Sequence, residues 1–177
     1  MLLKKLKNKN KKPPFEIGEV IVHPVHGIVK VQDIKEQTIL GEVKLYYVLK
    51  PLVERLSEVM IPVDKIRNLG LRKAVNSKEI INIFKVIQEP PMDMGKVMTN
   101  WGAQYQKNLK MVQSGNIIQV CQVLKYLAER KKKRNLSKTD DDLYEKALKL
   151  VVSEVSHVLD LDSAEVEILL EFILENE

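Results

Sequence analysis

The sequence predicts an α+β fold, in which a small bent antiparallel sheet or partial β-barrel is followed by a compact all-helical domain. Between residues 15 and 70, apolar residues alternate with polar ones, and glycines and prolines recur at short intervals, a pattern typical of short strands and tight turns. From Ser77 onward, apolar residues recur with the period of amphipathic helices. The predicted domains are a basic tail over 1–14, expected to be disordered, a sheet domain over 15–75 and a helical domain over 76–177.

The strands are predicted from two stretches of the sheet domain. In "GEVIVHPVHGIVKVQDI", apolar and polar residues alternate around Val20, Val22, Ile28 and Val31. The later stretch "VKLYYVLKPL" contains the aromatic and β-branched residues that pleated surfaces favour. Since several short strands fall within one small segment, we predict a strongly bent sheet.

The first helix is predicted over "SKEIINIFKVIQ", with Ser77 as its N-cap. Its apolar positions 80, 81, 83, 84 and 87 form the stripe expected to face a core. A second helix is predicted over roughly residues 100–113. It should end at Ser114 and Gly115, because glycine readily adopts the left-handed conformation that follows many helices.

Three further helices complete the predicted bundle. One follows Asn116 as N-cap and contains "IIQVCQVLKYLAERKKKR". The next begins near Ser137, where three aspartates suit the positive end of the helix dipole. The last begins at Asp162. The residues of these last two helices that we expect in the core are Leu143, Ala147, Leu150, Val151, Val155 and Val158, then Val166, Leu169, Leu170 and Ile173.

Charge is distributed unevenly along the chain. The formal net charge is +5, and residues 1–14 contain six lysines and no acidic residue. Residues 96–134 carry nine basic groups and one acidic group, whereas residues 135–177 carry three basic and twelve acidic groups. The basic segment predicts a polyanionic partner, although the acidic segment could instead neutralise it within the molecule.

The remaining composition restricts the compartment. The single cysteine, Cys121, excludes an internal disulfide and suits a reducing environment, so we expect a cytoplasmic location. No apolar run approaches the length that spans a bilayer, so no membrane association is expected.

Two groups of residues could in principle support chemistry. His23 and His26 with Cys121 could ligate zinc, but no CxxC or HExxH motif accompanies them. The triplet 140–142 could suggest a metal-dependent nuclease, but as the first turn of a helix its carboxylates are explained by the helix dipole. Phosphate-binding glycine loops and nucleophile elbows do not occur. We therefore expect no enzymatic activity, no cofactor and no metal.

The basic segment is more informative. Its cationic residues fall on two successive predicted helices and the loop after them. They could form an ordinary solvated face, but the near absence of acidic residues favours a groove that contacts phosphates without reading sequence. These residues are Lys107, Lys110, Lys125, Arg130, Lys131, Lys132, Lys133 and Arg134.

The only tryptophan, Trp101, has two interpretations. It shares a helical stripe with Tyr105, Leu109 and Val112, and this periodicity favours a core position. It also lies in the first turn of the predicted helix, where a large ring could extend beyond the edge of the bundle. The sequence pattern leaves both possibilities open.

Several motifs in order resemble the CarD/CdnL family of bacterial transcription regulators. They are "FEIGEVIVHPVHGIVKVQDI", "LGEVKLYYVLKPL", "VMIPVDKIRNLGLR" and "TNWGAQYQKNLKMVQSGNIIQVCQVLKYLAERKKKRNLS". The resemblance covers about residues 15–160, which is most of the chain. It implies a Tudor-like sheet domain that docks on the β subunit of RNA polymerase and a helical domain that contacts promoter DNA.

The resemblance also implies roles for individual residues. Trp101 would act as a wedge in the minor groove at the upstream edge of the melted bubble, which would stabilise the open promoter complex. Lys107 and Lys110 would contact phosphates, since relatives often carry basic residues at the positions held here by Ala103, Gln104 and Gln106. The polymerase-facing positions would be Gln37, Ile39 and Met60.

We therefore expect a transcription regulator that binds RNA polymerase and promoter DNA as a monomer. A second hypothesis is a protein-interaction adaptor that does not bind DNA, whose basic segment pairs with its own acidic segment.

Overall fold

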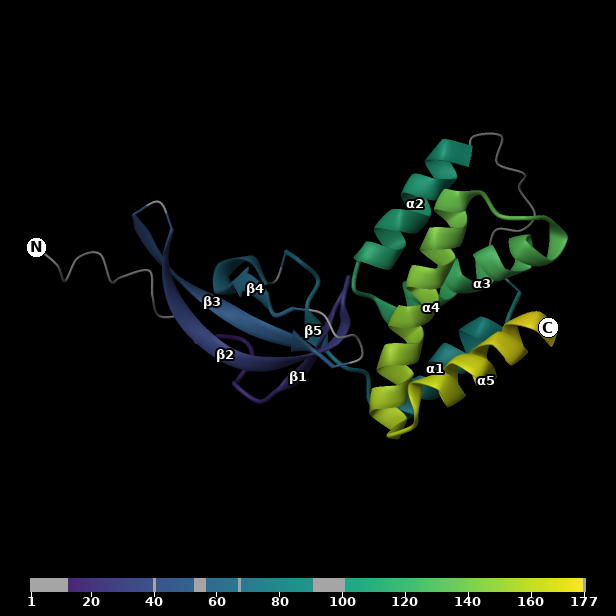
Figure 1. Ribbon diagram of the computed structural model, residues 1–177. Coiled ribbons are helices and arrows are strands. Elements are labelled where there is room, and N and C mark those ends of the chain that lie inside the picture. The colour runs from purple at the N-terminus through teal and green to yellow at the C-terminus, as the bar shows by residue number, and fades with distance from the viewer. Residues whose placement is uncertain (1–12, 40, 53–56, 67, 91–100, 177) are drawn as a thin grey trace, which may run out of the picture.

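The computed structural model describes residues 13–39, 41–52, 57–66, 68–90 and 101–176 (Figure 1). An antiparallel sheet is followed by a set of helices, so the α+β prediction is confirmed. Most of the basic tail predicted over 1–14 lies outside the described residues. No helix among the described residues is long and apolar enough to span a membrane.

The sheet is open, with the strand order β4-β3-β2-β1-β5, and every pair in it is antiparallel. A bulge between Val31 and Asp33 bends the long β2–β3 hairpin, which extends away from the helices in Figure 1. The predicted bent sheet is therefore present, and it does not close into a barrel. The strands are β1 (Val20–His23), β2 (Gly27–Ile39), β3 (Glu42–Pro51), β4 (Val59–Pro62) and β5 (Arg72–Lys73), with a 3₁₀ turn at Val63–Lys65.

One face of the sheet packs a small core of its own. Tyr47 is fully buried at its centre, and its hydroxyl donates to the Phe15 carbonyl (3.1 Å) and accepts from the Phe15 N–H (2.9 Å). These two bonds hold the segment before β1 against the sheet. The core consists of Phe15, Ile21, Val29, Val31, Tyr47, Leu49, Ile61, Ile66 and Leu71.

The helices share a second core, formed mainly by α3 and α4. The segment after β5 leads directly into α1, whose Ile80, Ile83 and Ile87 are buried in this core. In Figure 1, α1 and α5 lie together on one side of the bundle and α2 lies on the other. The helices are α1 (Ser77–Gln88), α2 (Trp101–Gln113), α3 (Ile117–Lys133), α4 (Lys138–Leu159) and α5 (Ser163–Asn176).

The predicted caps are correct with one exception. Asn116 and Ser137 cap α3 and α4 as expected. The predicted N-cap Ser77 is wrong, because Asn76 occupies that position and forms a reciprocal capping box with Glu79. The backbone at Asn76 is extended, so its amide oxygen reaches two N–H groups of the first turn.

Two residues predicted in the helical core lie on the surface instead. Ile81 is 58% exposed and Leu169 is 44% exposed. In α1 and α5 the buried stripe is narrower than the apolar pattern suggests, because each of these helices buries a single line of three residues. In α5 that line consists of Val166, Leu170 and Leu174, while Ile173 is half-buried.

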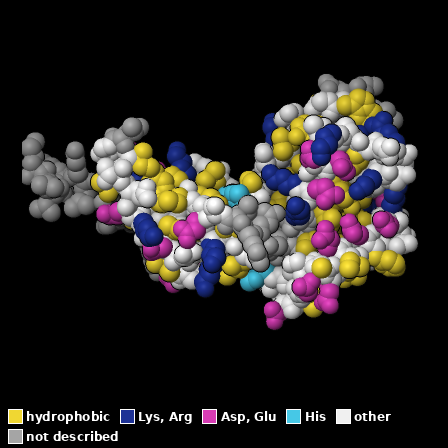
Figure 2. All heavy atoms as spheres, in the orientation of Figure 1, with side chains coloured by type: hydrophobic (Ala, Val, Ile, Leu, Met, Phe, Trp, Pro, Cys, Tyr) yellow, Lys and Arg dark blue, Asp and Glu magenta, His cyan; other side chains and the backbone are white. Residues whose placement is uncertain are grey.

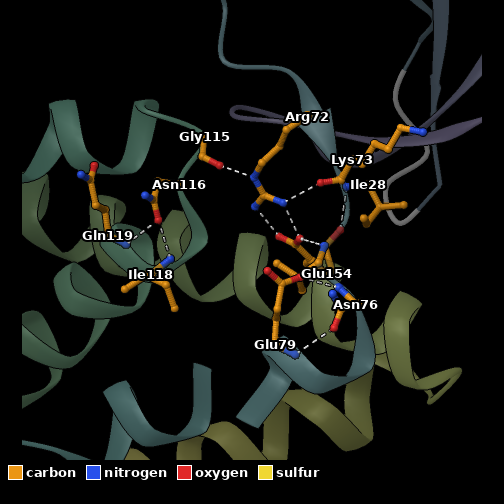
Figure 3. A network of polar contacts seen from close by, with 12 residues as sticks. Ile28, Arg72, Lys73, Asn76, Glu79, Gly115, Asn116, Ile118, Gln119 and Glu154 are labelled. Atoms are coloured by element: carbon orange, nitrogen blue, oxygen red, sulfur yellow. Dashed lines mark hydrogen bonds and ion pairs between the residues drawn. The ribbon is translucent and has the colours of Figure 1, made fainter. Parts of the chain in front are cut away.

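The sheet and the helices are joined through Arg72 of β5 (Figure 3). Its guanidinium forms a bidentate ion pair with Glu154 of α4, with N–O distances of 2.6 and 2.7 Å, and its Nε donates to the Gly115 carbonyl. Glu154 is completely buried and also accepts from the Val75 N–H (2.9 Å). One carboxylate therefore ties together the last strand, the entry to α1 and the middle of α4.

Backbone contacts complete this joint. A Cβ placed on Gly115 would collide with the Gly70 carbonyl oxygen, and both glycines have positive φ. On the other side of the joint, the Ile28 N–H donates to the Ser153 hydroxyl at 2.9 Å. The absence of a side chain at Gly115 allows the α2–α3 turn to lie directly against the end of the sheet domain.

Candidate functional site

Trp101 is the first residue of α2, and its side chain lies at the surface. It is 50% exposed, so the interpretation as a core residue is wrong. The helix instead buries Gln104, Asn108 and Val112, a face rotated by about one residue from the apolar stripe. Inside the bundle the Gln104 amide donates to the Asn108 amide oxygen at 2.8 Å, whereas the Asn108 Nδ2 has no hydrogen-bond partner among the described residues.

Two arginines from the end of α3 lie close to the Trp101 ring. The guanidinium carbons of Arg130 and Arg134 lie 4.9 and 4.3 Å from the ring centroid, within the range of cation–π attraction. These contacts join residues separated by about thirty positions, because α2 and α3 pack side by side. We call this group, made of Trp101, Arg130 and Arg134, the Trp–Arg cluster.

The two arginines of the Trp–Arg cluster differ in their surroundings. Arg134 follows the last turn of α3 and is exposed. The Arg130 side chain is only 13% exposed and pairs with Asp140 at 3.1 Å. It also lies 5.6 Å from the ring centroid of Tyr126. The positive charge of Arg130 is therefore largely balanced within the protein.

The other predicted DNA-contacting residues divide into exposed and buried ones. Lys107 and Lys110 are exposed on α2, and Lys131 and Lys132 are exposed near the end of α3. Lys131 lies 4.5 Å from the Tyr144 ring centroid, and Lys132 pairs with Glu129 at 3.0 Å. In Figure 2, basic side chains are more frequent over the upper part of the helical domain and acidic ones over its lower part.

Lys125 does not belong to this exposed set. It is 2% exposed, and its ammonium group pairs with Glu129 at 3.3 Å. The side chain lies on the inner face of α3, where its aliphatic part packs and its charge is balanced locally. In this conformation Lys125 cannot contact a phosphate, and we remove it from the candidate interface.

The three candidate polymerase-facing residues lie on one face of the sheet. Directly opposed residues of antiparallel strands share a face, and Met60 is opposite Val48, which is opposite Asp33. Gln37 and Ile39 share this face because they lie four and six residues from Asp33 on the same strand. The Gln37 amide nitrogen lies 3.8 Å from the Met60 sulfur.

This sheet face exposes apolar surface and pairs its charges locally. Ile39 and Met60 are 46% and 41% exposed. The nearby charges form short ion pairs within each strand, Lys35 with Asp33 at 3.4 Å and Lys44 with Glu42 at 2.8 Å. We call the exposed surface around Gln37, Ile39 and Met60 the sheet face. It has the mixed apolar and polar character of protein-binding surfaces.

The histidines and the cysteine do not form a metal site. His23 is buried, and its Nδ1 accepts hydrogen bonds from the N–H groups of Val25 (3.0 Å) and His26 (3.2 Å). Burial, and then the neighbouring His26, lower the pKa of His23 to about 4. Burial raises the pKa of the Cys121 thiol, which lies in the helical core. Among the described residues, no group of three or more side chains is placed to hold a metal ion.

Sequence reasoning missed Asp140 and Tyr126 as partners of Arg130, and Arg72 and Glu154 as the interdomain ion pair. Asp140 was attributed to the helix dipole alone, which accounts for its position but not for its ion pair. Arg72 and Glu154 are 82 residues apart and carry no local signal. Only the isolated position of Glu154 within an apolar helical stripe could have suggested a buried partner.

Two family models match the chain, and together they cover most of it. The model described as CarD-like/TRCF RID domain matches residues 15–75, and the one described as CarD, C-terminal domain matches residues 82–171. The first match ends just before α1, and the second extends from within α1 into α5. The sheet and the helical bundle therefore each match a different domain model.

A curated relative supports the same assignment. A Bacillus subtilis (strain 168) protein named "Putative transcription factor YdeB" is 27% identical over 141 residues, which are 80% of this chain and 90% of the relative. The similarity therefore spans both domains. The chain belongs to the CarD family of transcription regulators.

Proposed function

We propose that the protein binds the β subunit of RNA polymerase through the sheet face and stabilises the open promoter complex through the Trp–Arg cluster. It acts by binding, without a catalytic step, as a monomer in the cytoplasm. The observation that carries the proposal is the half-exposed ring of Trp101 in contact with two guanidinium groups. An apolar ring can fill an opened base step, and the adjacent cations suit the phosphates beside it.

The proposed wedge requires little sequence recognition. Once the polymerase has melted the promoter, the cost of unstacking the base pairs at the bubble edge has already been met. A ring that occupies the gap would then slow reannealing at any promoter. Selectivity would come from the polymerase and from how readily each promoter melts.

The proposal is tested by the lifetime of open complexes after addition of a competitor, with purified polymerase and the full-length protein. Stacking of one base on an aromatic ring contributes about 1–3 kcal/mol, so Trp101→Ala should shorten the added lifetime by roughly five- to a hundredfold. Phe172→Ala is a matched control, since Phe172 is an aromatic side chain that is 64% exposed on α5. Unchanged lifetimes in a folded Trp101→Ala variant would exclude the wedge.

One observation favours the second candidate, an adaptor that does not bind DNA. Arg130 of the basic segment pairs with Asp140 of the acidic segment. If such pairing were the role of the basic segment, forked DNA would not bind even with polymerase present. The proposed function instead predicts an affinity for forked DNA that falls steeply with salt concentration.

A further inference from the structure

Arg130 contacts Trp101 in a way that differs from a typical phosphate-binding arginine. One end of its guanidinium pairs with the Asp140 carboxylate, and the group lies 4.9 Å from the Trp101 ring centroid. Both members of the ion pair are mostly buried, with side chains 13% and 12% exposed. Little of Arg130 is therefore left to meet a partner in solution.

The position of Asp140 is itself fixed by the start of α4. Its N–H donates to the hydroxyl of the N-cap Ser137 at 3.2 Å, which places it in the first helical turn. The Tyr126 ring centroid lies 5.6 Å from the same guanidinium. A carboxylate from α4 and an aromatic ring from α3 thus constrain the Arg130 guanidinium beside α2.

We propose that Arg130 is a positioning residue, which holds the Trp101 ring in the orientation that enters the opened base step. This rests on the proposed function of Trp101. Arg134, which is exposed and 4.3 Å from the same ring, is the member of the Trp–Arg cluster that meets phosphate. The two arginines therefore have separate roles, one structural and one in DNA contact.

The planar shape of the guanidinium is essential to this role. A guanidinium can stack on an aromatic face while its edge pairs with a carboxylate, whereas an ammonium group is a compact, strongly hydrated charge that cannot do both. Holding the ring in place before DNA arrives removes an ordering cost from binding. Arg130→Lys should therefore keep the positive charge but no longer hold the Trp101 ring in its orientation.

The test uses the full-length protein and the single tryptophan as a reporter. Acrylamide quenching and anisotropy decay of Trp101 fluorescence measure the exposure and motion of the ring in the absence of polymerase. Arg130→Lys and Asp140→Asn should both make the ring more accessible and more mobile. Lys133→Gln, which removes an exposed charge from the same helical turn, should change neither measurement.

Function is measured in parallel. Arg130→Lys should shorten the open-complex lifetime by about two- to thirtyfold, the range that cation–π energies give. The slope of log affinity against log salt concentration for forked DNA should stay unchanged in Arg130→Gln, because the charge that is removed does not meet a phosphate. Circular dichroism establishes that each variant is folded.

The outcomes separate this proposal from the proposed function. Unchanged quenching and anisotropy in Arg130→Lys would overturn the positioning role whatever the lifetimes show. A salt slope reduced by about one in Arg130→Gln would also overturn it, because Arg130 would then be a phosphate ligand. If Trp101→Ala left lifetimes unchanged while Arg130→Lys freed the ring, the wedge would fail and the positioning of the ring would stand.

Discussion

The sheet face and the Trp–Arg cluster balance their charges in opposite ways. On the sheet face, each lysine that we describe pairs with a carboxylate two residues away, and Ile39 and Met60 remain exposed between them. In the Trp–Arg cluster, two cations share one aromatic ring, and one of them, Arg134, is exposed. The first arrangement suits a protein partner and should depend weakly on salt, whereas the second suits a polyanion.

The joint at Arg72 determines how the two surfaces lie relative to each other, so the largest expected effect comes from breaking it. Arg72→Ala would leave the completely buried Glu154 without its partner. Removing one member of a buried ion pair costs about 3–5 kcal/mol, which urea unfolding would measure. Lys73→Ala is the control, since Lys73 forms an exposed pair with Glu19 and should matter little. Equal losses in the two variants would contradict the role of the joint.

A second substitution tests whether the sheet face binds polymerase but not DNA. Ile39→Asp places a charge on the sheet face, and burying it against polymerase should lower that affinity by about tenfold or more. Binding to forked DNA without polymerase should not change. Val43→Asp is the matched control, because Val43 is 49% exposed near the tip of the same hairpin but points to the opposite face. If Val43→Asp were as harmful as Ile39→Asp, the assignment of the sheet face would be wrong.

Lys110 is exposed in the last turn of α2, and its substitution should affect binding to DNA but not binding to polymerase. If Lys110 contacts one phosphate, Lys110→Gln should reduce the slope of log affinity against log salt by about 0.7–0.9. Polymerase affinity without DNA should remain the same. Lys50→Gln, which removes an exposed charge from β3, should leave the slope unchanged. A slope that responds equally to both variants would indicate diffuse electrostatics.

The smallest effect at neutral pH concerns the β1–β2 turn, which contacts α4 through the Ile28–Ser153 hydrogen bond. His23 has a pKa of about 4 in the folded protein and about 6.5 otherwise, so between these values the unfolded chain binds more protons. The free energy of unfolding should be highest above about pH 6.5, and it should fall as the pH decreases toward 4. His23→Asn can still accept the Val25 N–H and should flatten this part of the pH profile. Melting temperatures of the wild-type protein and His23→Asn, measured from pH 4 to pH 7, would show this difference in pH dependence.

The sequence predicted those features of the fold that depend on local interactions. The order of strands and helices follows from periodicity, and the caps at Asn116 and Ser137 follow from side chains that bond to their own helices. The rotation of α2 was not predictable in this way. The buried face contains Gln104 and Asn108, which one hydrogen bond links, so the helix buries an amide pair and places Trp101 outside.

The candidate site was predicted in outline from the family resemblance and the charge pattern. The exposure of individual lysines and arginines could not be predicted, since a basic run in a sequence does not show which of its side chains face the interior. Lys125 is one turn from Glu129 and points into the bundle, while Arg130 meets a carboxylate from the next helix. Both differences depend on how α3 packs against α2 and α4, which no local pattern reveals.

The close contact of Gly70 with Gly115 fixes the distance between the sheet domain and the helical domain. Because backbone meets backbone there, no side-chain rotation can alter the distance between the sheet and the start of α3. If the proposed function is correct, the Gly70–Gly115 contact sets the distance between the polymerase-bound sheet and the point at which Trp101 meets DNA. A substitution that adds a side chain at Gly115 would push these two backbones apart and so displace the point at which the tryptophan meets DNA.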